Sequence, residues 1–232
     1  MVHYRVVIPA AGQGKRMKAG INKQFIAIGG KPMIVHTLSI FQTDPNCAEI
    51  VLVVNKRDME DVQRLVNAFA LTKVSHLAIG GKERQNSVYE GLKRLTVEDG
   101  IVLIHDGARP FVTQEMIRRV VRKASATGAA VLAVPVKDTI KQVDGESVVK
   151  TVDRSGLWAV HTPQAFRLSI IKEAHRQAET KHIQATDDAA LAEMAGYPVS
   201  VVSSDYFNIK ITTPEDLLVA EAILAAKEGE NS

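Results

Sequence analysis

Val6–Met17, VVIPAAGQGKRM, joins an apolar run of β-branched residues to a turn of small residues and then to cations. The apolar run predicts a buried strand. Gly12 and Gly14 allow backbone N–H groups to come close to a ligand, and Lys15 and Arg16 follow at once to neutralise negative charge. The stretch therefore predicts a phosphate-binding turn at the carboxyl end of a strand.

Further apolar runs alternate with helical patterns through residue 135. The apolar runs are continuous, which is typical of a parallel sheet covered on both faces. The sequence therefore predicts one α/β domain over residues 1–232, with a doubly wound, mostly parallel sheet and functional groups at the carboxyl ends of its strands. We expect strands at 49–54, 74–79, 101–104, 129–134, 158–162, 199–202 and 208–211, and helices at 33–42, 114–126, 168–179 and 214–227.

A different pattern follows the fifth strand. Residues 137–143 and 147–152 are rich in β-forming residues and flank the turn Asp144-Gly145-Glu146. They predict a β-hairpin. Because both of its faces carry polar residues, we expect the segment 136–156 to project as an arm that contributes to a homodimer.

The composition excludes several classes of protein. The balance of 29 Lys+Arg against 26 Asp+Glu leaves a net charge of +3, which argues against a nucleic-acid partner. Cys47 is the only cysteine, so no intrachain disulfide can form. No apolar run approaches the roughly 20 residues of a membrane span. We expect a cytoplasmic protein without a membrane partner.

Residue identities separate three kinds of phosphate chemistry. A P-loop needs Ser or Thr where Arg16 stands. A dinucleotide-binding loop needs a third glycine where Met17 stands, and an acid where the second strand ends in Asn55. Both fit weakly. The third kind of chemistry, nucleotidyl transfer, remains; in it, cations stabilise the negative charge on the leaving pyrophosphate. If the acceptor is itself a phosphate, its second pKa of about 6 means that it is already mostly ionised at neutral pH. Such an acceptor needs no general base.

Several motifs occur in order along the whole chain: PAAGQGKRM, KQF, HDGARPF, VKDTIK, TVDR, LWAVHTPQAF, ATDDA and NIKITTPEDL. In these motifs the sequence resembles the 2-C-methyl-D-erythritol 4-phosphate cytidylyltransferase family of the non-mevalonate isoprenoid pathway. The resemblance implies a Rossmann-like nucleotidyltransferase fold. It also implies transfer of a cytidylyl group from CTP to the sugar-alcohol phosphate, giving 4-diphosphocytidyl-2-C-methyl-D-erythritol and pyrophosphate.

The resemblance also implies the site residues. Thr139 and Arg154 would bind the acceptor phosphate from the arm of a neighbouring subunit. The ion implied is Mg²⁺, carried mainly by the nucleotide phosphates, with no metal site made by the protein alone. The residues implied are Arg16, Lys23, Lys210 and Asp106 for catalysis; Pro9, Ala10, Ala11, Gly12, Gly14, Gly80, Gly81 and Ser87 for the nucleotide; and Asp106, Arg109, Thr139, Arg154, Thr162 and Thr186 for the acceptor.

Some of these residues also have structural explanations. We expect His105 to be packed at a strand end, and we interpret Asp187 and Asp188 as helix-start charges. The structural alternatives are a capping box of Ser87 with Glu90, a helix cap by Thr186, and an ion pair between Asp106 and Arg109.

Two other functions stay open on the sequence alone. A pentitol-phosphate cytidylyltransferase, such as one acting on ribitol 5-phosphate, shares the loop, hairpin and lysine. Gly107-Ala108, ATDDA and NIKITTPEDL favour the methylerythritol enzyme. The other alternative is a non-catalytic nucleotide-binding module, for which charge changes at Lys23 or Lys210 would matter little.

Overall fold

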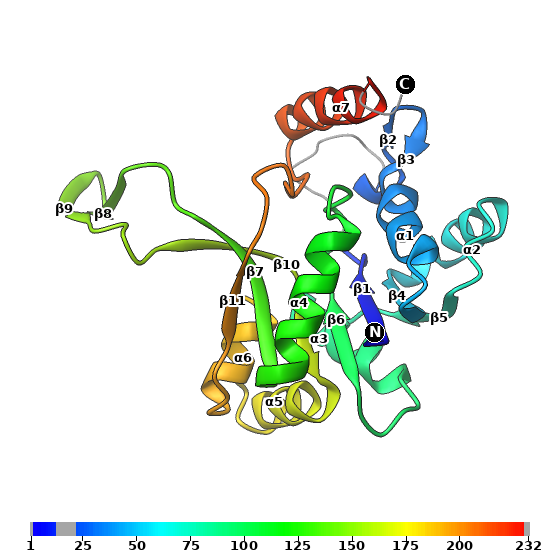
Figure 1. Cartoon of the computed structure of the whole chain (residues 1–232), viewed down its shortest axis with the longest axis horizontal. Helices are drawn as coiled ribbons and strands as arrows, with labels where there is room; N and C mark the ends of the chain where they lie inside the picture. The colour runs from blue at the N-terminus through cyan, green and yellow to red at the C-terminus, as the bar shows by residue number, and fades with distance from the viewer. Residues whose placement is uncertain (1, 13–21, 230–232) are drawn as a thin grey trace.

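The computed structural model describes residues 2–12 and 22–229 and contains one large sheet with helices on both faces (Figure 1). The helices are α1 (Met33–Thr43), α2 (Met59–Ala68), α3 (Arg84–Arg94), α4 (Gln114–Thr127), α5 (Leu168–Thr180), α6 (Asp188–Met194) and α7 (Pro214–Gly229). The strands are β1 (Tyr4–Pro9), β2 (Ala27–Ile28), β3 (Lys31–Pro32), β4 (Cys47–Val54), β5 (Val74–Ile79), β6 (Ile101–Ile104), β7 (Ala129–Pro135), β8 (Ile140–Asp144), β9 (Ser147–Val152), β10 (Trp158–Arg167) and β11 (Ser200–Ser203).

The large sheet has the strand order β11-β7-β10-β6-β1-β4-β5. All neighbours pair in parallel except β10, which is antiparallel to both β6 and β7. Alternate residues of β1 face opposite sides: Ile8 belongs to the core cluster that includes residues of α1, α2 and α4, whereas Val7 belongs to the cluster that includes residues of α3, α5 and α6. The predicted doubly wound, mostly parallel sheet is confirmed.

Strand β10 differs from the expectation that it ends before Pro163. It continues to Arg167 through the middle of the sheet, with an irregular register between His161 and Gln164. The irregularity accommodates Pro163, which has no N–H to give to a neighbouring strand. The strand expected at 208–211 is also wrong, because these residues form no strand. Ile211 N instead donates to Ala108 O at 2.9 Å, which holds this segment against the strand ends.

The predicted hairpin is present as β8 and β9, which among the described strands pair only with each other (Figure 1). It stands away from the rest of the chain, connected to β7 on one side and β10 on the other. Val143, Val148 and Val149 are each more than half exposed on it. Within residues 2–12 and 22–229, no helix is long and apolar enough to cross a membrane.

Candidate active site

A cavity of about 280 Å³ opens at the carboxyl ends of β1 and β6, beside the start of α3. Its walls contain side chains that are far apart in the sequence, from the first strand to the segment before α7. The predicted residues that line it are Pro9, Ala11, Gly12, Lys23, Gly81, Ser87, Asp106 and Lys210. The remaining predicted residues are placed individually below.

Asp106 lies at the centre of an ion cluster in this cavity. Lys210 Nζ is 2.7 Å from Asp106 Oδ2, and Arg84 Nε donates to Asp106 Oδ1 at 2.9 Å. Burial would raise the pKa of Asp106, but the charges of Arg84 and Lys210 outweigh it and hold that pKa well below its usual range. Asp106 is therefore an ionised carboxylate that fixes both cations.

Lys23 reaches the same place from a short 3-10 turn, Lys23–Phe25. Asn22 caps this turn by accepting from Gln24 N at 3.1 Å, and Asn22 Nδ2 donates to buried Asp58 at 2.6 Å. Lys23 Nζ donates to Ile211 O at 3.3 Å, next to Lys210 in the chain. Lys23 and Lys210, both predicted to be catalytic, therefore lie on one side of the cavity.

Ser87 holds the glycine turn at the other side. Its Oγ accepts from Gly81 N at 3.1 Å and donates to Glu83 O at 3.1 Å. A Cβ on Gly80 would come within 2.5 Å of Ala11 Cβ, so only glycine allows the two loops to approach this closely. The capping box of Ser87 with Glu90 is wrong, because α3 begins at Arg84 and Ser87 lies inside its first turn.

Arg109 and Thr162 are buried beside Asp106 in the structure but do not line this cavity. Arg109 Nη1 donates to Asn208 O at 2.6 Å, and Arg109 makes no ion pair with Asp106 among the described residues. The ion-pair alternative is therefore wrong. Thr162 is 5% exposed, and its hydroxyl accepts from Asp106 N at 3.0 Å. Thr162 thus positions the backbone of Asp106.

His105 is packed at the end of β6, as expected, with no exposed surface. Its Nε2 lies 3.0 Å from Arg109 O and its Nδ1 3.3 Å from Thr162 Oγ1. Burial lowers the pKa of His105 to about 4. The ring is therefore neutral at neutral pH and supports the loop that follows it.

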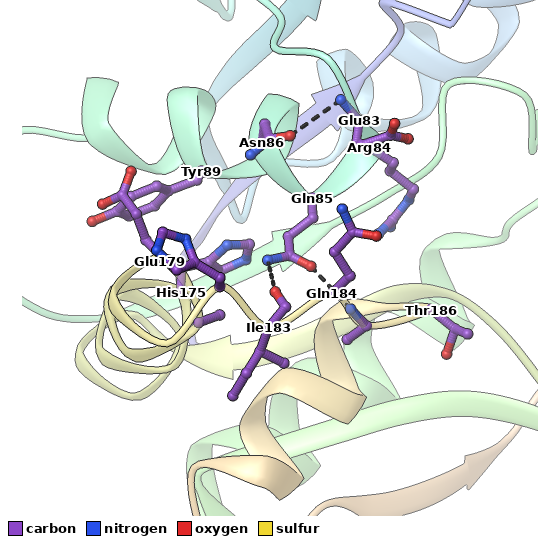
Figure 2. Close-up of a pocket in the computed structure, with 13 residues that line it drawn as sticks. Glu83, Arg84, Gln85, Asn86, Tyr89, His175, Glu179, Ile183, Gln184 and Thr186 are labelled. Carbon is purple, nitrogen blue, oxygen red and sulfur yellow. Dashed lines mark hydrogen bonds between the residues drawn. The ribbon is translucent and has the colours of Figure 1, made fainter.

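A second cavity of about 440 Å³ adjoins the first, and both are lined by Glu83 and Arg84 (Figure 2). Thr186 is exposed on its wall. The capping alternative for Thr186 is wrong, because Asp187 caps α6 by accepting from Ala190 N at 2.9 Å. Figure 2 places Thr186 on the loop before α6, toward one edge of this cavity.

The remaining predicted residues are not gathered by the described part of one chain. Thr139 and Arg154 are exposed where the arm leaves the sheet and line neither cavity. Ala10 is buried and does not line the first cavity. Gly14 and Arg16 lie outside the described residues.

Arg84 and Asp188 were missed by the sequence interpretation. Asp188 is a helix-start residue, but it is also 1% exposed and lies 2.7 Å from Arg84 Nη1. Arg84 offered a signal, because it occupies the first position of α3, where the helix dipole disfavours a cation. A cation in that position indicates that neighbouring carboxylates compensate it.

The fold and the site together define a nucleotidyltransferase, in which clustered cations and a glycine turn meet at strand ends. A model of the family described as IspD, 2-C-methyl-D-erythritol 4-phosphate cytidylyltransferase, matches residues 4–226. The chain belongs to this family.

Individual relatives agree over nearly the whole chain. The 2-C-methyl-D-erythritol 4-phosphate cytidylyltransferase of Halalkalibacterium halodurans is 58% identical over 227 residues, covering 98% of this chain and 99% of the relative. That of Bacillus velezensis is 55% identical over 100% of both chains. The crystal structure of the enzyme of that name from Thermus thermophilus is 33% identical, with a TM-score of 0.77 over 94% of this chain and 98% of the other.

Proposed function

We propose that the cavity at the ends of β1 and β6 is where this chain transfers the cytidylyl group of CTP to 2-C-methyl-D-erythritol 4-phosphate. The reaction releases pyrophosphate and gives 4-diphosphocytidyl-2-C-methyl-D-erythritol, an isoprenoid precursor. The observation that carries this assignment is the convergence of Lys23, Lys210 and Asp106 in one cavity of a chain that belongs to this family.

The proposed chemistry depends on position and charge. An oxygen of the acceptor phosphate attacks the α-phosphorus of CTP, and the bond to the pyrophosphate oxygen breaks. Lys23 and Lys210 stabilise the negative charge that develops, while Asp106 holds Lys210 in place. Gly12 and Gly81 line the same cavity, and in this proposal they lie on its nucleotide side.

We propose that Mg²⁺ is held chiefly by the triphosphate, whose charge it would neutralise. The described residues contain no group of three His, Cys, Asp or Glu side chains that could hold a metal ion. Glu83 and Asp106 are the acidic side chains among the described residues lining the cavity, and both oxygens of Asp106 already contact cations. These residues fit an ion that arrives with the nucleotide.

We propose further that the arm completes a homodimer. An isolated two-stranded hairpin is at best marginally stable in water, and this one exposes three valines. Thr139 and Arg154 lie where the arm joins the sheet, and in this proposal they bind the acceptor phosphate in the partner's cavity.

Substitution of the two lysines tests the site. Lys23→Gln and Lys210→Gln should each lower kcat by roughly 10²- to 10³-fold, since each removes a charge that acts in the transition state. Pyrophosphate release with CTP, Mg²⁺ and methylerythritol phosphate measures this. Lys93→Gln, on the exposed side of α3, is the control and should keep normal turnover. Normal turnover in both site variants would make the assignment wrong, and release with ribitol 5-phosphate alone would make the acceptor wrong.

A further inference from the structure

A chain of ion pairs and hydrogen bonds leads from the reaction cavity into the protein. Lys210 contacts Asp106, and Asp106 contacts Arg84. Arg84 Nη1 is 2.7 Å from Asp188 Oδ2, and His175 Nε2 is 3.0 Å from Asp188 Oδ1. The five residues come from α3, α5, α6, the end of β6 and the segment before α7.

Asp188 cannot act by touching substrate in the reaction cavity. It is 1% exposed, and it does not line that cavity. A buried carboxylate is costly unless its oxygens are paired. Among the described residues, each oxygen of Asp188 has one hydrogen-bond partner, Arg84 or His175, so the contact that leads toward the reaction cavity is the one with Arg84.

His175 is itself held firmly. It is 2% exposed, and its ring stacks on Tyr89 with centroids 5.4 Å apart and planes 9° apart. Figure 2 shows Tyr89 and His175 together on one wall of the second cavity, with Arg84 on another. His175 therefore gives Asp188 a fixed donor on the side away from Arg84.

The planar guanidinium of Arg84 contacts Asp106 and Asp188 at the same time, and these two contacts fix its orientation. Its donors form a rigid fork, so bonds from Nε to Asp106 and from Nη1 to Asp188 fix the plane of the group. In this arrangement Arg84 contacts one oxygen of Asp106 and leaves the other to Lys210. Without Asp188, Arg84 could rotate to hold both oxygens of Asp106 in a bidentate pair, and Lys210 would lose its partner.

We propose that Asp188, held by His175, is a positioning residue for cytidylyl transfer: it fixes Arg84 so that Asp106 keeps Lys210 directed at the reacting phosphate. The inference rests on the proposed function, in which Lys210 and Asp106 act on the substrates.

Asp188→Asn keeps the size of the side chain and removes its charge. It should lower kcat by roughly 10- to 100-fold, because a small displacement of a catalytic group has an effect of this size. KM for CTP should change far less, since Asp188 does not line the cavity. Asp187→Asn is the matched control: Asp187 caps α6 and accepts from Gln164 at 2.7 Å, without an ion pair to Arg84. Its kcat should stay within about twofold of the wild type.

A double-mutant cycle separates positioning from general stability. Arg84→Lys keeps the charge but loses the fork, so adding Asp188→Asn to it should cause no further fall in kcat. Independent structural damage would instead multiply the two losses. Multiplied losses, an Asp188→Asn kcat equal to that of Asp187→Asn, or a change in KM alone would each overturn the proposal.

His175→Phe keeps an aromatic ring against Tyr89 and removes the donor to Asp188. His175→Phe should also lower kcat, by a smaller factor than Asp188→Asn. If Asp188→Asn does not fold, His175→Phe tests the proposal in its place. An unchanged kcat in His175→Phe would then overturn the proposal. Lys210→Gln is measured beside these variants. If it keeps turnover, the proposed site itself is wrong; if it is inactive while Asp188→Asn is fully active, only the positioning role is wrong.

Discussion

His105 shows how one buried ring couples acidity to stability. Protonation would force its Nδ1 to donate where it now lies 3.3 Å from the Thr162 hydroxyl, in a site with no exposed surface. The unfolded chain has no such constraint. Its His105 takes up a proton near pH 6.5, whereas the folded chain does so only near its lowered pKa of about 4.

We expect the free energy of unfolding to fall as the pH decreases from about 6.5 toward 4, because the unfolded state then binds the extra proton. At pH 4.5 the loss of stability due to His105 should be roughly 2–3 kcal/mol. Urea titrations at pH 7 and 4.5 measure it, with His105→Gln showing a shallower dependence. The pKa of His161 is also lowered to about 4, but His161 remains in both proteins. Equal pH dependence in the two proteins would contradict this assignment.

At the scale of elements, α3 depends on a glycine where it crosses the sheet. A Cβ on Gly91 would lie 2.4 Å from Val7 Cγ1 and 2.8 Å from Val53 Cγ2. Gly91→Ala gains up to about 1 kcal/mol of helix propensity but overpacks a buried contact, at a cost of roughly 1–3 kcal/mol. We expect a net loss of stability of about 1–2 kcal/mol by urea denaturation. Lys93→Ala, on the exposed side of the same helix, should change stability by no more than about 0.5 kcal/mol.

Most elements could be predicted from the sequence because their apolar periods are local. The continuous run Ile101–Ile104 and the helical pattern of α4 are examples. The spacing of apolar residues does not specify which strands pair with one another. The antiparallel position of β10 between β6 and β7 could therefore not be predicted from the residues alone. Pro163 predicts the end of a strand, because proline is rare inside a central strand, but here an irregular register accommodates it.

The same limit applies to the site. Lys23, Asp106 and Lys210 could be located through motif resemblance, and they do line one cavity. Arg84 could not be paired with Asp188, which lies 104 positions later in the chain and looked like an ordinary helix-start charge. Ion pairs between distant segments follow from packing, which no local pattern contains.

At the scale of the whole molecule, the proposed role of the arm predicts that each active site contains residues of both chains of the dimer. Lys210→Gln and Arg154→Gln should each lose nearly all activity alone, because in this proposal each removes one part of every site. If the arm of one chain completes the site of the other, a mixed dimer has one intact site. An equal mixture, unfolded and refolded together, should regain about a quarter of wild-type activity. Lys210→Gln mixed with Lys23→Gln is the control and should regain none, since both residues lie in the same body. No recovery in the first mixture would contradict a shared site.

Strand β10 has a consequence for synthesis of the chain. In the large sheet, β10 lies between β7 and the group of neighbouring strands β6, β1, β4 and β5. All five of these strands precede β10 in the sequence, so they are synthesised before it. Until residues 158–167 leave the ribosome, the facing edges of β6 and β7 have no partner from β10. Unpaired edges are templates for association with other chains. While the arm is being made, the nascent protein therefore carries both of these facing edges unpaired, and the later strand β10 closes them together.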